Sequence, residues 1–311
     1  MRGQIAFIFP GQGSQYVGMG RELAEAYPDA GRLFVQANEL LGVDLQGIIF
    51  NGPEETLDQT IYTQPAMLTA SAVAYHVLTS EGVQPQIVAG HSLGEYTALL
   101  AAGAISFEQA VTLVSKRAEY MQQAVPANQG AMAAIVGLDK EAVTSICREF
   151  SPPNVVEAAN FNCPGQIVIA GFKSAVEEAM QKARARGAKL ATLLPVSIPS
   201  HCSLMAVAGN HLALELDDVN FREARIPVVT NVDAKPITSA DEAKKALVKQ
   251  IYSPVLWEDS ILKMRALGVE IFIEVGPKRV LGKLIKRIDS AARTFSVENL
   301  ESLRETLSQL A

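Results

Sequence analysis

Short apolar runs alternate with longer segments of helical character along this chain, and this alternation predicts an α/β protein. The apolar run at 5–9 is ended by proline and glycine and predicts a buried strand, and 86–89 predicts another. Residues 64–80 are apolar at most positions, as in a largely buried helix. A helix of small residues is expected at 93–102, where a glycine closes it. Strand and helix therefore follow one another, as in a parallel α/β sheet.

A capping box marks the start of the next helix. Ser106 precedes the apolar pattern and Gln109 follows three residues later, so each side chain can satisfy a free backbone N–H of the other residue. We expect this helix to run to about residue 123 and to carry Arg117.

The middle of the chain has a different pattern, which we interpret as an inserted unit. Its expected elements follow the order β-α-β-β-α-β, which is the ferredoxin-like arrangement. They are strands at 130–138, 155–161, 165–171 and 188–196 and helices at 140–149 and 174–186. We predict a ferredoxin-like subdomain at 128–196, inserted in a large α/β-hydrolase-like catalytic domain made of 1–127 and 197–311. The second part of the large domain is expected to contain two strands and a helix, at 226–232, 270–276 and 278–288.

Composition agrees with a globular protein of a reducing compartment. The 311 residues are 49% hydrophobic and carry a net charge of −6 without a polybasic tract, which argues against nucleic acid as a partner. The three cysteines show neither zinc-type spacing nor a disulfide framework, so we expect no metal site. The N-terminus lacks the apolar length of a signal peptide, and no later segment approaches a membrane span. We expect a cytoplasmic monomer that does not bind membranes.

The pentapeptide GHSLG at 90–94 is the most informative stretch. It matches G-x-S-x-G, with a predicted strand before it and a predicted helix after it, which is the context of a nucleophile elbow. The sharp turn would expose the hydroxyl of Ser92, and the amide of Leu93 at the helix start could stabilise an oxyanion. The alternative is a glycine-rich turn with a capping serine, and the flanking elements make it the weaker interpretation.

A serine nucleophile needs a base, and the chain has four histidines. His201 is the best candidate because it lies in a proline-containing loop before a helix, although a capping role is the alternative. His91 belongs to the elbow itself, His76 is expected in the core and His211 in solvent. Cys202 is expected to be a small buried residue and not a nucleophile. An α/β-hydrolase would place an acid between serine and histidine, but no strand-end aspartate stands out.

Two other features indicate what the serine could capture. The glycine-rich stretch at 9–20 fails the tests for nucleotide loops, because position 16 is Tyr16 and no Gly-Lys-Ser/Thr follows. Its free amides could supply a second oxyanion donor, or it could be a structural turn alone. The guanidinium of Arg117 is suited to grip a carboxylate, and the alternative is a solvated helix face beside Glu119.

Several stretches together match the pattern of one family. They are FPGQGSQ at 9–15, TQPAMLTAS at 63–71, GHSLGEYTAL at 90–99, NFNCPGQIVIAG at 160–171, PSHCSLM at 199–205, NVDAKPI at 231–237, QIYSPVLW at 250–257 and EVGP at 274–277. With these the sequence closely resembles the bacterial malonyl-CoA:acyl carrier protein transacylases of type II fatty acid synthesis. It is also similar to the acyltransferase domains of polyketide synthases.

The resemblance implies a role for each matching position. Ser92 would be the nucleophile that becomes the malonyl ester, and His201 would be its base. The main-chain carbonyl of Gln250 would hold that histidine in place of an acid. The amides of Gln12 and Leu93 would form the oxyanion hole.

The same resemblance implies a substrate pocket and a reaction. Arg117 would pair with the malonyl carboxylate, and Met121, Asn160 and Asn162 would line the site. The malonyl group would pass from malonyl-CoA to Ser92 and then to holo acyl carrier protein, with no cofactor besides the coenzyme A thioester substrate. The alternatives are a trans-acting polyketide synthase acyltransferase, a serine thioesterase or hydrolase, and a non-catalytic carrier-binding module.

Carrier proteins are generally acidic, so a basic helix is a candidate docking site. Lys283, Lys286 and Arg287 are spaced to share one helix face, and we expect them to help dock the carrier. A basic solvated helix is the alternative interpretation.

Overall fold

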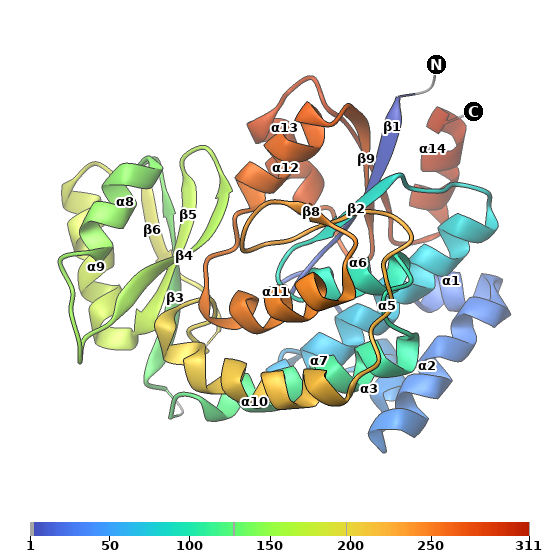
Figure 1. Cartoon of the computed structure of the whole chain (residues 1–311), viewed down its shortest axis with the longest axis horizontal. Coiled ribbons are helices and arrows are strands. Elements are labelled where there is room, and N and C mark those ends of the chain that lie inside the picture. The colour runs from blue at the N-terminus through green and yellow to red at the C-terminus, as the bar shows by residue number, and fades with distance from the viewer. Residues whose placement is uncertain (1–2, 127, 197, 311) are drawn as a thin grey trace.

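A six-stranded sheet forms the centre of the larger of two domains (Figure 1). The computed structural model describes residues 3–126, 128–196 and 198–310. Each strand is parallel to its neighbour except at one edge, where β7 and β8 are antiparallel. In order across the sheet, the strands are β10 (Arg293–Val297), β9 (Val269–Val275), β1 (Gln4–Phe9), β2 (Ile87–Gly90), β7 (Val228–Val229) and β8 (Pro236–Ile237). The predicted parallel core is confirmed.

Side chains of the central strands alternate between two hydrophobic cores, one on each face of the sheet. Phe7 and Phe9 enter the larger core, whereas Ala6 and Ile8 enter the smaller one. The helices that pack on the larger core include α5 (Thr60–Ser80), α6 (Gly94–Ala101), α7 (Phe107–Gln123), α10 (Ala206–Asp218), α11 (Ala240–Tyr252) and α14 (Leu300–Leu310). Those on the smaller core are α12 (Trp257–Ala266) and α13 (Leu281–Ile288). Because both faces are covered, the central strands appear in the sequence as continuous apolar runs.

Four helices after the first strand were not predicted from the polarity pattern. They are α1 (Arg21–Ala26), α2 (Pro28–Leu41), α3 (Leu45–Asn51) and α4 (Glu54–Leu57). Three of them have fewer than eight residues and bury only one or two side chains each, so they show too few turns for a helical period. All four add residues to the larger core.

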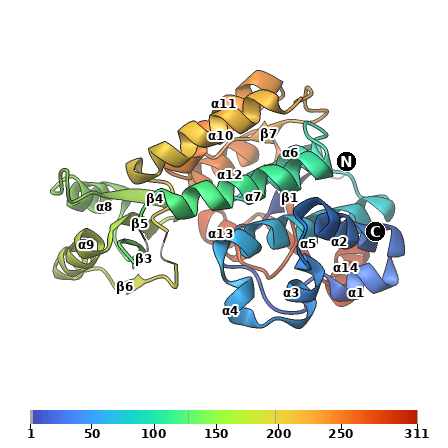
Figure 2. The ribbon, with the colours of Figure 1, turned by 90° about the horizontal axis from the view of Figure 1, so that it is seen from below.

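The inserted unit has the predicted ferredoxin-like arrangement. Its antiparallel sheet has the strand order β4-β5-β3-β6, and two helices pack on one face. The elements are β3 (Gly130–Val136), α8 (Lys140–Cys147), β4 (Val156–Cys163), β5 (Gln166–Phe172), α9 (Lys173–Ala185) and β6 (Leu190–Leu193). Figures 1 and 2 both show this small domain at the opposite end of the molecule from α1 and α2. Its borders at 127/128 and 196/197 stay a prediction, because residues 127 and 197 lie outside the described residues.

The small domain joins the large one through backbone hydrogen bonds and a shared apolar cluster. The N–H of Phe161 in β4 donates to the carbonyl of Val255 (2.9 Å), and the N–H of Val255 donates to the carbonyl of Ala159 (2.9 Å). The face of the small sheet that the helices leave free packs on Cys202 through Met132, Ala159, Val168 and Ala170. The insert therefore supports the loop that carries the neighbouring His201.

Two local predictions were wrong. The helix expected from residue 278 begins at Leu281, because Lys278 has a left-handed backbone (φ 61°). The buried carboxylate of Glu274 accepts the free N–H groups of Val280, Leu281 and Gly282 at 2.9–3.0 Å and so fixes the helix start. His76 is exposed, since α5 turns that position to solvent, and it is not a core histidine. None of the helices within the described ranges is long and apolar enough to cross a membrane.

Candidate active site

The strand-to-helix turn at Ser92 has the geometry of a nucleophile elbow. Ser92 has φ 52°, a left-handed conformation that is strained for a residue with a side chain. A Cβ on Gly90 would lie 1.8 Å from the carbonyl carbon of Gly94, and a Cβ on Gly94 would lie 2.1 Å from the carbonyl oxygen of Phe9. Both glycines are therefore required for the close approach of β1, β2 and α6.

Asn231 braces this turn from a distant part of the chain. Its Oδ1 accepts the Ser92 N–H (2.7 Å), and its Nδ2 donates to the carbonyl of Gly90 (2.7 Å). Because the Ser92 amide is used in this way, it is not available to a substrate. The amides of Leu93 and Gln12, by contrast, donate to no other residue in the described part of the chain. These two N–H groups can therefore serve as oxyanion donors.

Ser92 and His201 form a hydrogen-bonded dyad. The Ser92 Oγ lies 2.7 Å from Nε2 of His201, and Nδ1 of His201 lies 2.8 Å from the main-chain oxygen of Gln250. A carbonyl can only accept, so Nδ1 carries the proton and Nε2 is free to accept the serine proton. The amide of His201 also donates to the carbonyl of Ile251 (3.0 Å), which ties the histidine loop to α11. The predicted nucleophile, base and orienting carbonyl are brought together.

The surroundings of His201 keep its ring neutral. The residue is 2% exposed, and burial, with the nearby charge of Arg117, lowers its pKa to about 3. A neutral imidazole is the form that can accept the serine proton. No carboxylate is needed to select the tautomer, because the Gln250 carbonyl does so.

Arg117 is buried beside the nucleophile, contrary to the solvated alternative. Its guanidinium donates to Gln64 Oε1 (2.7 Å), to Ser92 Oγ (3.1 Å) and to Gln250 Oε1 (3.1 Å). The side chain is 1% exposed, and burial lowers its pKa. Its Nε has no partner among the described residues, and every partner of its other nitrogens there is neutral. The site therefore holds a buried positive charge that is hydrogen-bonded to no anion among the described residues.

A cavity of about 120 Å³ connects these groups. Its lining includes seven of the predicted site residues: Gln12, Ser92, Leu93, Arg117, Met121, Asn160 and His201. Met132, Leu194, Val196 and Ile198 add apolar wall, much of it from the small domain. The pocket is thus closed by both domains, with the polar groups on the side of the large one.

Asn162 was predicted to line the site, and the structure places it elsewhere. Its Oδ1 accepts a hydrogen bond from Nε2 of His91 (2.9 Å), and it is not part of the cavity lining. The ring of His91 packs edge-on against Trp257 with 5.5 Å between ring centres. Strand alternation alone would put Asn160 and Asn162 on the same face of β4, but the register with β5 shifts between Phe161 and Cys163, and Asn160 lines the cavity while Asn162 contacts the elbow.

Three polar residues of the site were missed at the sequence level: Gln64, Glu95 and Asn231. Glu95 is 1% exposed, and burial raises its pKa to about 7. A single acidic residue in a helix of small apolar residues could have marked it, and it stands in the quoted stretch GHSLGEYTAL. Gln64 and Asn231 likewise lie in quoted stretches, but their partners are far away in sequence.

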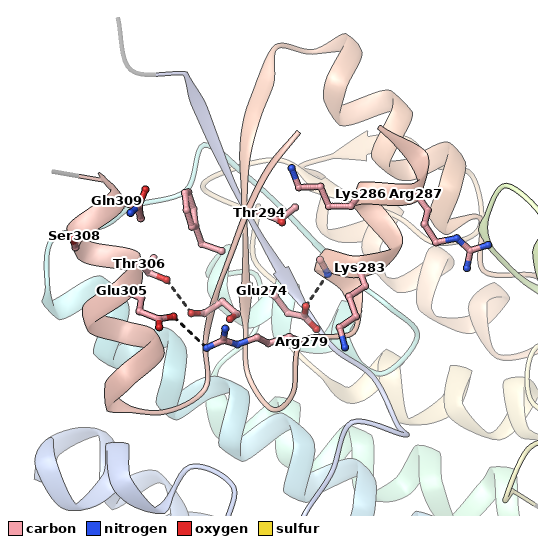
Figure 3. Close-up of a pocket in the computed structure, with 13 residues that line it drawn as sticks. Glu274, Arg279, Lys283, Lys286, Arg287, Thr294, Glu305, Thr306, Ser308 and Gln309 are labelled. Carbon is pink, nitrogen blue, oxygen red and sulfur yellow. Dashed lines mark hydrogen bonds and ion pairs between the residues drawn. The ribbon is translucent and has the colours of Figure 1, made fainter. Parts of the chain in front are cut away.

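A cavity of about 860 Å³, much larger than the one at the dyad, lies between α13, α14 and β10 (Figure 3). The volume of a cavity does not by itself identify the active site. The lining of this larger cavity has no histidine or cysteine, and its hydroxyl groups come from Thr294, Ser296, Thr306 and Ser308. The predicted docking cations Lys283, Lys286 and Arg287 stand on its rim and are exposed. They do not point in one direction: Arg287 turns to the small domain and donates to the carbonyl of Pro164 (3.2 Å).

Comparison with known proteins identifies the class. The acyl transferase domain family matches residues 6–303, so the chain belongs to the acyl transferase family. The malonyl CoA-acyl carrier protein transacylase of Escherichia coli K12 is 51% identical over 92% of this chain and 93% of its own. The solved acyl carrier protein S-malonyltransferase of Vibrio cholerae superposes with a TM-score of 0.95 at 48% identity, covering 97% of this chain and 99% of that one.

A third similar protein was solved with its partner. It is a malonyl-transacylase in complex with a holo type II PKS acyl-carrier protein, with a TM-score of 0.96, 45% identity and coverage of 98% of this chain and 99% of that one. The family predicted from the quoted motifs is therefore confirmed.

The neutral state of His201 predicts an unusual pH profile. The rate at which Ser92 reacts with an uncharged sulfonyl fluoride should change less than about twofold between about pH 8 and about pH 5, whereas a histidine with a pKa near 6.5 would lose about 30-fold. The measurement is the labelling rate by intact mass, with His201→Ala as the slow control. A decline centred near pH 6.5 would contradict the lowered pKa.

Proposed function

We propose that this protein transfers the malonyl group from malonyl-CoA to the phosphopantetheine thiol of holo acyl carrier protein, supplying extender units for fatty acid biosynthesis. The observation that carries the proposal is the buried guanidinium of Arg117, 3.1 Å from the Ser92 hydroxyl and hydrogen-bonded only to neutral groups among the described residues. A buried cation beside a nucleophile favours an acyl group that brings its own carboxylate. The names of the similar proteins agree with this substrate and this acceptor.

In the first half-reaction, Ser92 attacks the thioester carbonyl of malonyl-CoA while Nε2 of His201 takes the hydroxyl proton. The C–S bond breaks, the protonated histidine returns its proton to the coenzyme A sulfur, and malonyl-Ser92 remains. In the second half-reaction, His201 deprotonates the carrier thiol, which attacks the ester and releases the Ser92 oxygen with the same proton. Both half-reactions consist of acyl and proton transfers that Ser92 and His201 carry out, so the proposed reaction uses no cofactor besides the coenzyme A thioester substrate.

Each tetrahedral intermediate develops a negative oxygen that the amides of Gln12 and Leu93 would stabilise. Two preorganised N–H groups contribute about 3 kcal/mol each to such a transition state. The dipole of α6 adds to the stabilisation at Leu93, which directly precedes that helix. Met121 and Asn160 line the same cavity and would shape the room for the malonyl chain.

We also propose the cellular setting of this reaction. The three cysteines are buried free thiols, as in proteins of a reducing compartment, and we place the enzyme in the cytoplasm. We expect the protein to act as a monomer, with the dyad and its cavity on one chain. A serine hydrolase could use the same dyad, and a polyketide synthase carrier could accept the same ester. The fate of the acyl-serine distinguishes a hydrolase from a transferase.

The fate of that ester is the test of the proposed function. Mixing the protein with malonyl-CoA should add one malonyl group in the intact mass, and Ser92→Ala should abolish the adduct. The adduct should persist in buffer and move to holo carrier protein when it is added. An adduct that disappears into free malonate without a carrier would establish a hydrolase, and the absence of any adduct would contradict both enzymes.

Arg117→Ala should change the choice of acyl group. Removal of the guanidinium should lower kcat/KM for malonyl-CoA by about 100-fold or more and leave acetyl-CoA relatively favoured, because the carboxylate loses its charged partner. Lys116→Ala, which removes an exposed cation on the same helix, is the matched control. An unchanged malonyl-to-acetyl preference would show that Arg117 does not bind the carboxylate.

We further propose that Lys283, Lys286 and Arg287 help dock the acidic carrier. Lys286→Glu should raise the KM for the carrier several-fold and weaken its salt dependence, whereas the KM for malonyl-CoA should not change. Arg32→Glu on α2, at the opposite end of the molecule from the small domain, reverses an exposed charge far from this helix. Equal effects of the two reversals, or no effect of either, would place the docking surface elsewhere.

A further inference from the structure

The side-chain amide of Gln250 lies at the centre of the site and makes three hydrogen bonds. Its Nε2 donates to the carboxylate of Glu95 (2.7 Å) and to the carbonyl of Ser92 (2.8 Å). Its Oε1 accepts from the guanidinium of Arg117 (3.1 Å). The residue is fully buried, so no water competes for these bonds.

Only one orientation of this amide is compatible with its neighbours. A flipped amide would turn its NH₂ group toward the guanidinium, donor against donor. Its oxygen would face the Glu95 carboxylate and the Ser92 carbonyl, acceptor against acceptors, so all three bonds would be lost in a buried site. The Glu95 oxygen that accepts this bond also accepts the backbone N–H of Asn231, so it remains an acceptor in either protonation state of the carboxyl group and fixes the amide together with the Ser92 carbonyl.

Glu95 is itself held in place. It occupies the first turn of α6, three residues after the nucleophile, and the same carboxylate oxygen accepts the backbone N–H of Asn231 (3.2 Å). It is 1% exposed and makes no hydrogen bond to Arg117 within the described ranges. Its hydrogen-bonded link to the guanidinium therefore runs through Gln250, beside a direct Coulombic attraction that Glu95→Gln would remove while keeping the link.

We propose that Glu95 is a positioning residue for acyl selectivity: it fixes the Gln250 amide, which in turn holds the Arg117 guanidinium where the substrate carboxylate binds. Gln250 then has two separate tasks, since its main-chain carbonyl orients His201 while its side chain orients Arg117. This inference rests on the proposed malonyl transfer and adds to it the element that sets the preference for a carboxylated acyl group.

The test compares acyl selectivity with the reactivity of the dyad. We would measure kcat/KM for the acylation of Ser92 by malonyl-CoA and by acetyl-CoA, and the labelling rate of Ser92 with an uncharged sulfonyl fluoride. Glu95→Ala should lower the malonyl-to-acetyl ratio by about tenfold or more, while labelling stays within about threefold of the unmodified protein. Glu95→Gln keeps a carbonyl acceptor for the Gln250 N–H and should restore the ratio to within about threefold.

Two further variants keep the inference testable. Gln250→Met removes the amide and leaves the main-chain carbonyl, so it should reproduce the loss of selectivity even if Glu95→Ala does not fold. Glu274→Gln alters another buried carboxylate, which caps α13, and should lower the melting temperature without changing the ratio.

The outcomes separate this inference from the proposed function. If the unmodified protein shows no malonyl adduct, the proposed function fails, and this inference with it. If the unmodified protein prefers malonyl-CoA and the ratio survives in Glu95→Ala or in Gln250→Met, only the inference is overturned. Parallel losses of malonyl transfer, acetyl transfer and labelling would assign Glu95 a purely structural role and would also overturn it.

Discussion

The burial of one positive charge determines most of the polar arrangement in this protein. Arg117 is taken out of water on α7 without a carboxylate partner, which costs several kcal/mol unless a ligand supplies the anion. Neutral acceptors from α5 and α11 hold it in place through Gln64 and Gln250. Burial, and after it the same charge, lowers the pKa of His201, so that the base is neutral before the substrate arrives. Arg117 thus contributes both to recognition of the acyl group and to readiness of the base.

The two domains contribute different kinds of contact to this arrangement. The large domain supplies the elbow, the base and the guanidinium from parallel strands and the helices around them. The small domain supplies apolar wall and a sheet face on which the loop of Cys202 packs. Because β4 is hydrogen-bonded to Val255 just after α11, the insert and the helix that carries Gln250 are linked directly. The small domain thus contacts the chain segment that follows Gln250 as well as the loop that carries His201.

Local features could be predicted from the sequence, and distant contacts could not. The elbow, the capping box of α7 and the ferredoxin-like order follow from neighbouring residues, so polarity and glycine positions were sufficient. The role of the Gln250 carbonyl came from family resemblance alone. The hydrogen bond between Asn231 and Ser92 joins residues that are 139 positions apart, and the bond between Glu95 and Gln250 joins residues that are 155 positions apart. The polarity pattern of a sequence does not predict contacts over such separations. Asn162 and His76 failed for a related reason, since the face that each presents is decided by tertiary packing.

The short N-terminal helices show the same limit for the fold. They bury few side chains each and become helical through contact with the larger core, so their pattern is weak. The cavity between α13 and α14 is larger than the one at Ser92 but contains no candidate nucleophile–base pair. The small cavity at Ser92 has the dyad, the two free amides and the unpaired cation together.

A crystal structure of the malonyl-loaded protein would show directly where the acyl carboxylate lies once it is bound. We expect the malonyl group on the Ser92 Oγ, its carboxylate within about 3 Å of the Arg117 nitrogens, and the Gln250 amide still between Arg117 and Glu95. A carboxylate in solvent or on another cation, with Arg117 unchanged, would contradict the account.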